Sequence, residues 1–546
     1  MTRKFHNYLY NRHKILTGSI LCLFAVCIVA QTNKNKPSTL PTKPIIHRKG
    51  TKVNLEYASV LEYDKFRGAD YQLLHDSVRF RQDHMYMYCD SAKFFDKTNS
   101  LEAFGNVKMQ QGDTLFVYSD YLYYDGNTQL AKLRYNVKME NRSVTLLTDS
   151  LNFDRRLNIG YFFNGGVLSD MQSSNVLTSV YGQYSPATKI ADFRYNVKLV
   201  NDKMTIYSDT LHYNTATKVA NIAGPSTILS DQNTIYTDKG WYNTLKENSM
   251  LFNRSLLVTK GKTLTGDTLC YNRKKGIGEA FGYMHLKDSV NKADLYGNYG
   301  YYNEQTKKAF STKLAWAREY SRPDTMFISA DTLMATEPDT TYRMLFGFHR
   351  VRFFSKDSQG VSDSLQYSSK DSILHLYRDP VLWNANYQLA GDTIHAYMND
   401  STIKMALVKG YSLAIEQLDS IKGFYNQLSG KSLRADFEHG DIRKVDVSGN
   451  VETIFYPLDK DSTMIGLNHS ESSYLTMWLL NRKLERLKMW PTVTGSMTPE
   501  EAIKQNQKQL KNFRWYSQTR PRSPMDIFRH KNTKIEPVKR IQRRSR

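Results

Sequence analysis

A unit of about 30 residues recurs along the chain, and this recurrence constrains the fold more than any other feature of the sequence. The phrase RYNVKM at residues 134–139 returns as RYNVKL at residues 194–199, two units later. Each unit reads small residue, Asp, any residue, Leu, any residue, Tyr, and Asn or Asp, followed by Thr-x-x-Ala and an apolar run. Its aspartate position recurs every 29 to 33 residues, at Asp90, Asp120, Asp149, Asp209, Asp238, Asp267, Asp331, Asp363 and Asp392, with Val180 and Asn298 in degenerate copies.

Apolar and polar residues alternate within the unit, which predicts strands rather than helices. Val107 and Met109 fall on one face of such a strand, and Lys108 falls on the other. Gly-Asn pairs precede the apolar strands at residues 104–109 and 448–454, and they predict a turn or bulge there. Because an array adds core one unit at a time, the sequence predicts an all-β, solenoid-like stack of repeats.

The first 50 residues are predicted to lie outside this stack. Residues 1–30 combine a cationic start, an uninterrupted apolar run and a small residue, Ala30, which are the three parts of a secretory signal peptide. The apolar run of residues 15–30 is short for a bilayer span, which needs about 20 residues, although retention as a membrane anchor is the alternative. Residues 31–50 are rich in Pro and Lys and are predicted to be a linker.

The repeats are predicted to occupy residues 51–320 and to continue over residues 321–490, either as one array or as a second one. The frame loosens around residues 310–345, where two prolines fall, and this stretch is either a kink or a boundary. After residue 490 the pattern changes, and residues 491–546 are predicted to hold one short helix and a basic tail.

The helix is predicted over residues 498–510, where Thr498, Pro499 and Glu501 form a helix-start signal. An aromatic cluster follows, which either caps the last strand or binds a partner; it consists of Phe513, Trp515 and Tyr516. The tail contributes much of the formal net charge of +22, so it is either a solvated segment or a contact for anionic partners such as phosphate-bearing lipid surfaces. Predicted export argues against nucleic acid as the partner.

Two cysteines remain after the predicted signal peptide, Cys89 and Cys270. They lie about six units apart, which separates them by far more than the roughly 7 Å that a disulfide tolerates between Cα atoms. The sequence therefore predicts two free thiols, half-buried in the sheet.

No pattern of catalytic residues stands out. The 13 histidines are scattered, and neither a metal-spaced His or Cys cluster nor a nucleophile or phosphate-loop motif is present. Because the aspartate recurs once per unit, a structural hydrogen bond at a turn or bulge explains it better than catalysis. We predict a non-enzymatic protein without metal or cofactor.

The unit resembles the repeat of the OstA-like family, which includes periplasmic lipopolysaccharide-transport proteins of the LptA type and the periplasmic domain of LptD. The resemblance rests on residues 103–131, AFGNVKMQQGDTLFVYSDYLYYDGNTQLA, and on VSGNVETI at residues 447–454. It covers roughly residues 53–455 and implies a twisted β-jellyroll, open like a V, with an apolar trough for the acyl chains of lipid A. The chain is longer than the LptA-type proteins, and the resemblance implies no role for its C-terminal segment.

The resemblance implies a periplasmic conduit that carries lipopolysaccharide toward the outer membrane, associated with either the inner or the outer membrane. Other Lpt-type envelope proteins, or further copies arranged head to tail, are expected to join through edge strands at Val53 and Leu55. The predicted trough residues are Val107, Met109, Leu115, Val117, Val137, Met139, Val197, Leu199, Leu211 and Tyr213. The alternative is a structural scaffold, in which the same side chains fill a dry core and the surface binds envelope proteins.

Overall fold

The structure is a computed structural model that describes residues 51–529, apart from residues 64–69, 322, 340, 400–402, 420–422, 439–440, 460–462 and 482. The described residues belong to one compact unit, Gly50–Arg546. The predicted signal peptide, linker and basic tail lie outside the described residues, so those three predictions are not addressed by the structure.

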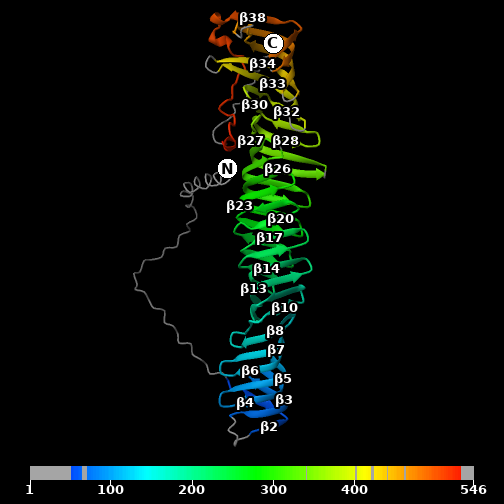
Figure 1. The fold of residues 1–546 in the computed structure, drawn as a ribbon, viewed down its shortest axis with the longest axis vertical. Helices are drawn as coiled ribbons and strands as arrows, with labels where there is room; N and C mark the ends of the chain where they lie inside the picture. Colours follow the sequence, from blue (N-terminus) through cyan, green and yellow to red (C-terminus); the bar gives the residue numbers. More distant parts are fainter. Residues whose placement is uncertain are drawn as a thin grey trace, which may run out of the picture. The chain divides into compact units, whose positions relative to one another are not determined.

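A single sheet of 38 strands, paired antiparallel throughout, runs through the described residues, and this confirms the all-β prediction. Its strands follow one another along one axis in the order of the sequence (Figure 1). The first part contains β1 (Asn54–Tyr57), β2 (Val60–Glu62), β3 (Gln72–Gln82), β4 (Met85–Phe95), β5 (Ser100–Gln111), β6 (Leu115–Asp125), β7 (Leu130–Asn141), β8 (Val144–Asp154), β9 (Ile159–Phe162), β10 (Gly166–Asp170), β11 (Asn175–Ser179), β12 (Tyr181–Ser185), β13 (Ile190–Asn201), β14 (Met204–Asn214), β15 (Val219–Ile222), β16 (Ser226–Leu229), β17 (Asn233–Thr237), β18 (Gly240–Asn243), β19 (Asn248–Phe252), β20 (Leu256–Thr259), β21 (Lys262–Thr265), β22 (Thr268–Asn272), β23 (Ile277–Asp288), β24 (Ala293–Asn303) and β25 (Lys308–Glu319).

The sheet continues without interruption from β25 into the second part of the chain. The second part contains β26 (Met326–Asp339), β27 (Tyr342–Phe354), β28 (Gln359–Ser368), β29 (Ile373–Tyr377), β30 (Val381–Asn384), β31 (Tyr387–Ala390), β32 (Thr393–Met398), β33 (Ile403–Asp419), β34 (Phe424–Glu438), β35 (Asp441–Phe455), β36 (Gly466–Leu480), β37 (Lys483–Trp490) and β38 (Thr494–Pro499), followed by the 3-10 turns η1 (Glu500–Ala502), η2 (Gln505–Gln507) and η3 (Pro524–Phe528).

Each rung of the stack turns a corner at its middle. A rung is either one long strand with a register shift at its centre, as in β7, or two short strands separated by a few residues, as in β9 and β10. The shift in β7 inserts two residues with positive φ, Tyr135 and Asn136, and β13 repeats it with Tyr195 and Asn196. The repeated phrase RYNVK therefore encodes a corner, and the predicted bulge at Gly105–Asn106 is the same device.

The repeated aspartates hold these corners. Asn106 Nδ2 donates to Asp90 Oδ2 at 2.9 Å, and Asn136 Nδ2 donates to Asp120 Oδ2 at 2.7 Å. At Gly105, φ is +70° and a Cβ would lie 2.5 Å from Asp90 Oδ2, so both the backbone conformation and the aspartate require glycine. The aspartates thus have the structural role that the recurrence predicts.

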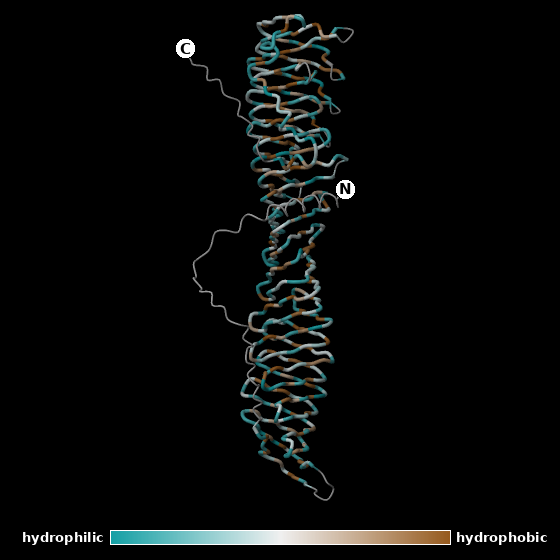
Figure 2. The backbone as a smooth tube through the Cα atoms, turned by 90° about the vertical axis from the view of Figure 1, so that its left-hand side faces the viewer, coloured by the Kyte–Doolittle hydropathy of each residue, from teal (hydrophilic) through white to brown (hydrophobic). Residues whose placement is uncertain are grey.

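The corners divide every rung into two half-strands, which form two facing walls. Wall A comprises β10, β11, β16, β17, β20, β21, β30 and β31, with the half-strands in line with them, such as Val107–Gln111 of β5. Wall B comprises β9, β12, β15, β18, β19, β22, β29 and β32, with half-strands such as Ser100–Phe104 of β5. Figure 2 shows hydrophobic and hydrophilic residues interspersed along each rung, as expected for walls with one inner and one outer face.

The inner faces of the two walls enclose an apolar core. One cluster of buried side chains runs from Val53 to Ala309, and a second runs from Ala315 to Leu475. Leu295 packs against both clusters, so the core is continuous at the stretch where the sequence frame loosens. Both Cys89 and Cys270 are free, as predicted, and Cys270 is half-buried. Cys89 is instead buried in the first cluster, which corrects the prediction for this residue, and its burial raises the pKa of the thiol to about 12.

The predicted helix over residues 498–510 is not formed, and this prediction was wrong. Thr498 and Pro499 pair with Leu467 and Gly466 of β36, and this pairing keeps them extended. Sheet pairing overrides the local helix-start signal, and only the short turns η1 and η2 follow.

Residues 503–529, here called the strap, run back along wall A instead of continuing the stack (Figure 1). Their backbone carbonyls accept hydrogen bonds from side chains of β34, β31, β27 and β26. The bonds are Gln427 Nε2 to Lys508 O at 2.7 Å, Gln388 Nε2 to Arg514 O at 2.7 Å, Arg352 Nη2 to Thr519 O at 2.8 Å and Ser329 Oγ to Ile527 O at 2.5 Å. Arg352 lies between the inward-facing Val351 and Phe353, so the strap covers the outer face of wall A.

The aromatic cluster of the strap does not cap the last strand. Phe513 and Trp515 contact Tyr425 of β34, with ring centroids 5.3 and 5.4 Å apart. Tyr516 packs against the small buried cluster around Trp383 of β30. The cap predicted at the end of the stack is therefore a lateral cover several rungs away.

Candidate functional site

All ten predicted trough residues lie inside the core, and the structure brings them together in one cluster. Eight of them line wall A, and Leu211 and Tyr213 face them from wall B. Each is almost fully buried, with no more than 4% of its surface exposed: Val107, Met109, Leu115, Val117, Val137, Met139, Val197, Leu199, Leu211 and Tyr213. Their inward orientation agrees with the alternation in the sequence.

The two walls interlock at several levels of the core. Met139 of wall A reaches across to Gly160 of wall B, where a Cβ would lie 3.3 Å from the Met139 Sδ. Further along, a Cβ on Gly300 of wall B would collide with the side chain of Met284 of wall A. Glycines in one wall thus receive long side chains from the other, and in this structure the trough implied by the resemblance is closed at these levels.

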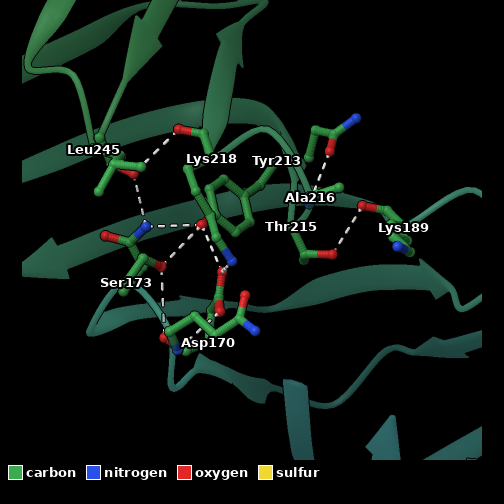
Figure 3. A network of polar contacts seen from close by, with 12 residues as sticks. Asp170, Ser173, Lys189, Tyr213, Thr215, Ala216, Lys218 and Leu245 are labelled. Carbon is green, nitrogen blue, oxygen red and sulfur yellow. Dashed lines mark hydrogen bonds and ion pairs between the residues drawn. The ribbon is translucent and has the colours of Figure 1, made fainter. Parts of the chain in front are cut away.

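A line of polar contacts, here called the seam, joins the two walls on the side opposite the corners. Hairpin turns end the half-strands of both walls on this side, which we call the mouth. The central part of the seam is built on Asp170, at the end of β10 in wall A (Figure 3). Its carboxylate accepts hydrogen bonds from Tyr213 of β14 at 2.9 Å and from Lys218 Nζ at 2.6 Å. The Asp170 side chain is fully buried and that of Lys218 is 8% exposed, so this ion pair is shielded from water.

Further hydrogen bonds complete this part of the seam. Asn175 Nδ2, across the turn from Asp170, donates to the Tyr213 hydroxyl at 2.7 Å and to Thr244 Oγ1 at 2.8 Å. Thr244 Oγ1 in turn donates to the Lys218 carbonyl at 3.1 Å. One network of polar side chains therefore links three turns, and opening the mouth here requires breaking the contacts that Asp170 and Asn175 of wall A make with wall B.

Similar ties recur on both sides of Asp170. Toward the N-terminus, Arg155 Nη1 of wall B donates to Gln82 Oε1 at 2.9 Å, and its Nη2 lies 3.3 Å from Asp83 Oδ2 of the adjacent turn. Toward the C-terminus, Lys203 of wall A pairs with Glu247 of wall B. The hydrogen bond from Lys203 lowers the pKa of Glu247, so its carboxylate is charged at neutral pH.

The tyrosine of the repeat frame contributes to both core and seam. The rings of Tyr124, Tyr184, Tyr213 and Tyr242 are buried, and the first three have hydroxyls that bond across the mouth, to Gln82, Asn141 and Asp170. Burial raises the pKa of Tyr213 and raises that of Tyr242 to about 12. These hydroxyls therefore remain neutral at physiological pH.

A polar cleft of about 980 Å³ lies at the mouth beyond these ties. Its lining includes six cations and five carboxylates, some of them paired, such as Arg273 with Glu247 at 2.9 Å and Lys262 with Glu337 at 3.4 Å. Within the described part of the chain, Lys260, Lys274 and Arg343 form no ion pair. These three cations are available to an anionic ligand.

The predicted edge-strand residues lie at the first rung. Leu55 belongs to β1, which pairs on one side with β3. Val53 precedes β1, its side chain is 1% exposed within the core, and its backbone N–H donates to Asn99 Oδ1 at 2.8 Å. Of the two residues, Leu55 is therefore the one placed on a strand at the end of the sheet.

The sequence reasoning missed the seam and the cleft. Asp170 and Lys218 are 48 positions apart, and nothing local marks them as partners. A usable signal existed in the tyrosines that recur four residues after the frame position, at Tyr124, Tyr184, Tyr213, Tyr242 and Tyr271, because buried tyrosines need polar partners for their hydroxyls.

Comparison with known protein families gives a match to the first part of the chain. Residues 50–209 and 202–274 match the model of a family described as OstA-like protein. No curated protein matches the chain. In the part of the chain that the structure describes, no helix has the length and apolar character needed to span a bilayer.

Proposed function

Residues 50–274 are OstA-like, and from this premise we propose that the protein is a non-catalytic carrier of lipopolysaccharide in the periplasm. In this proposal it conducts the lipid toward the outer membrane, with the acyl chains of lipid A held between walls A and B. The ten trough residues would contact those chains. The family points to an envelope role in lipid transport, and the acyl-chain site and direction are our extension of it.

The observation that carries the proposal is the continuity of the apolar core through the OstA-like residues. Buried apolar side chains from Val53 to Ala309 form one continuous cluster. Each CH₂ of an acyl chain that leaves water for such a surface contributes about 0.8 kcal/mol. A few chains are therefore sufficient for tight binding without any covalent step.

Loading requires the walls to part, because the trough residues are buried in the closed structure. The mouth is the side where they can separate, since its contacts are side-chain hydrogen bonds and ion pairs that water can replace. The corners are held by continuous backbone. The sugars and phosphates would then remain at the mouth, where the cleft offers Lys260, Lys274 and Arg343 to phosphate groups.

Partners would join at the ends of the sheet. β1 at the first rung and β38 at the last are strands at which another Lpt-type protein, or a second copy placed head to tail, can add its own strand.

Locking the mouth tests the proposal. We would replace Asn175 and Thr244 by cysteine in a chain whose native thiols, Cys89 and Cys270, are changed to alanine. The Asn175 Nδ2 and Thr244 Oγ1 atoms are 2.8 Å apart, so these two side chains meet across the mouth, and thiol titration would establish that the bridge forms. The exported mature chain would be oxidised, offered lipopolysaccharide and analysed by mass spectrometry. We expect the oxidised form to take up at least tenfold less lipid than the reduced form.

The matched control is the pair Tyr123→Cys and Lys132→Cys, which are direct partners on neighbouring strands of wall B. A bridge there joins two rungs of one wall and leaves the mouth free, so lipid uptake is expected to be unchanged. A mature chain that neither carries glycolipid on purification nor binds added lipopolysaccharide would rule the carrier function out.

The interlocked core favours a second candidate, a structural scaffold with a dry interior that binds envelope proteins. Met284 packed over Gly300 leaves no room for an acyl chain at that level unless the walls move. The same locking experiment separates the candidates, because a scaffold would bind no lipid in either redox state and its partners would be retained in both.

A further inference from the structure

One stretch of the outer face of wall A is almost free of charge. It spans nine consecutive half-strands, from β8 to β21, each of which directs two side chains outward. Only Lys198 among these side chains is charged. The others are aliphatic, aromatic or hydroxyl-bearing: Thr145, Leu147, Val167, Ser169, Val176, Thr178, Val200, Thr205, Tyr207, Thr227, Leu229, Thr234, Tyr236, Leu256, Val258, Thr263 and Thr265. We call this surface the charge-free face.

The charge-free face is exposed and has defined limits. Every one of its side chains is at least partly exposed, and Tyr236 is 50% and Leu147 is 46% exposed. On the N-terminal side, the outward positions of wall A carry charge again at Lys138 and Glu140 of β7. On the other side, charge returns at Lys287 of β23 and its neighbours. A solvated sheet face of this size normally carries charges, so their absence indicates a surface that meets a partner.

The same outer face is covered further along the stack. Over β26 to β34 the strap packs on it, and its last turn, η3, ends with Phe528 against Trp316 of β25. Apolar outward residues of wall A are thus buried wherever the chain supplies a cover. The charge-free face continues the same outer surface, but no segment of the described chain covers it.

We propose that two copies of the chain pack face to face through the charge-free face. Nine strands at about 4.8 Å spacing and half-strands of four to five residues give a face of roughly 40 Å by 15 Å. Two such faces bury roughly 1,200 Å² in total, which reaches the lower end of stable specific interfaces. Sheets pack in this way about 10 Å apart with their strands nearly aligned.

The lack of charge also suits this face to a second copy. Burying an unpaired charge in an interface is costly, and this face presents one charged side chain among 18. The single cation of the face, Lys198, is the direct cross-strand partner of Tyr207, and its Nζ lies 5.6 Å from the centroid of the Tyr207 ring. Its aliphatic stem can pack in an interface while this ring contacts the ammonium group. The fifth of the nine strands is β14, so a two-fold axis through the centre of the face passes near Tyr207 and brings the two Tyr207 side chains together.

Sedimentation velocity on the mature chain, residues 31–546, tests this arrangement without reference to lipid carriage. We expect a concentration-dependent dimer in the micromolar range and at least tenfold weaker association for Tyr207→Glu. The control is Tyr118→Glu, which places the same charge on the outer face of wall A at β6, outside the charge-free face. It is expected to leave the dimer unchanged.

A charge-swap mixture checks the two-fold geometry. Tyr207→Glu and Tyr207→Lys should each be monomeric alone, and an equimolar mixture should recover the dimer because opposite charges then meet at the axis. A wild-type chain that stays monomeric, including one that sediments with lipid vesicles as a monomer, would overturn the proposal. So would a dimer that Tyr207→Glu does not weaken, or a mixture that fails to associate.

Discussion

The two parts of the sheet differ in the contacts that supplement their strand pairing. In the first part, up to about β25, buried polar groups such as Asp170 and Lys218 tie the mouth, and the outer faces of both walls are open to solvent. In the second part, the strap covers the outer face of wall A, and the buried apolar residues form three clusters instead of one. The repeat thus determines the rungs and corners and contributes its tyrosine to the seam, while Asp170, Lys218 and the strap lie outside the repeat frame.

Equivalent positions show where this difference is encoded. Phe116 and Tyr118 of β6 lie four and two residues before Asp120, point outward and are partly exposed. At the same places before Asp363 of β28 stand Gln359 and Val361, which are 4% and 3% exposed under the strap. Gln359 Oε1 accepts a hydrogen bond from Arg520 Nε of the strap at 2.9 Å, so the outward residues of this part contact the strap instead of solvent.

Removing the strap is the strongest way to break the comparison. Truncation after Pro499 exposes the apolar residues that the strap buries, including Val361, Val381 and Trp383. Exposing a large buried apolar side chain to water costs about 1.5–3 kcal/mol of folding free energy. We therefore expect the second part alone to lose on the order of 5 kcal/mol of stability. Hydrogen exchange should report faster opening of β27 to β36 and unchanged protection of β3 to β20, because distant rungs do not touch.

A truncation after Arg529, which retains the strap, is the matched control and should behave like the full chain. If the shorter truncation destabilised both parts equally, the two parts would form one cooperative unit and the comparison would fail.

The buried ion pair of the first part should give the next largest effect. Lys218→Ala leaves the Asp170 carboxylate buried without its cation, which typically costs about 3–5 kcal/mol. Lys444→Ala in the second part removes a cation whose pair with Asp446 is more than one third exposed, so its cost is expected to stay below about 1 kcal/mol. Urea denaturation of both variants measures the difference, and the double change Asp170→Asn with Lys218→Met should recover most of the loss.

Acid should loosen the mouth before it loosens the strap. Because Lys203 lowers the pKa of Glu247, this carboxylate adds stability above its unfolded pKa of about 4.3, and the contribution is lost as the pH falls through the lower folded value. The strap contacts named above use amide, hydroxyl and guanidinium donors, which do not titrate in this range. Hydrogen exchange at pH 6 and pH 3 should show β10 to β18 opening first, and Glu247→Gln should reduce the pH dependence.

The repeated features were predictable from the sequence because they depend on local rules. The 29- to 33-residue period predicted the stack, and alternation placed residues such as Val137 and Met139 on the inner face, where the structure has them. The Gly-Asn signal at residues 105 and 106 predicted the bulge, since left-handed backbone conformations favour these residues. Each of these features depends only on residues in the same rung or in an adjacent one.

The closures were not predictable because they join residues that no local rule relates. The contact between Arg352 and Thr519 spans 167 positions, and the one between Ser329 and Ile527 spans 198. At Thr498 and Pro499 a valid local helix signal lost to pairing with β36, which the sequence pattern did not reveal. The seam likewise joins residues from separate units, such as Asp170 and Lys218, which are 48 positions apart.

The corners have a consequence for how such a chain changes its length. Arg134 and Arg194 stand at equivalent places in β7 and β13, and the residues after them, YNVK, are the same in both. Splicing the chain from one arginine to the other would delete four whole rungs, or roughly 19 Å of reach, without moving any side chain from inside to outside. Duplication or loss of such segments in the gene can therefore change the length of the stack by whole rungs. The strap would keep its contacts with β26 to β34, because these strands lie outside the duplicated or deleted segment.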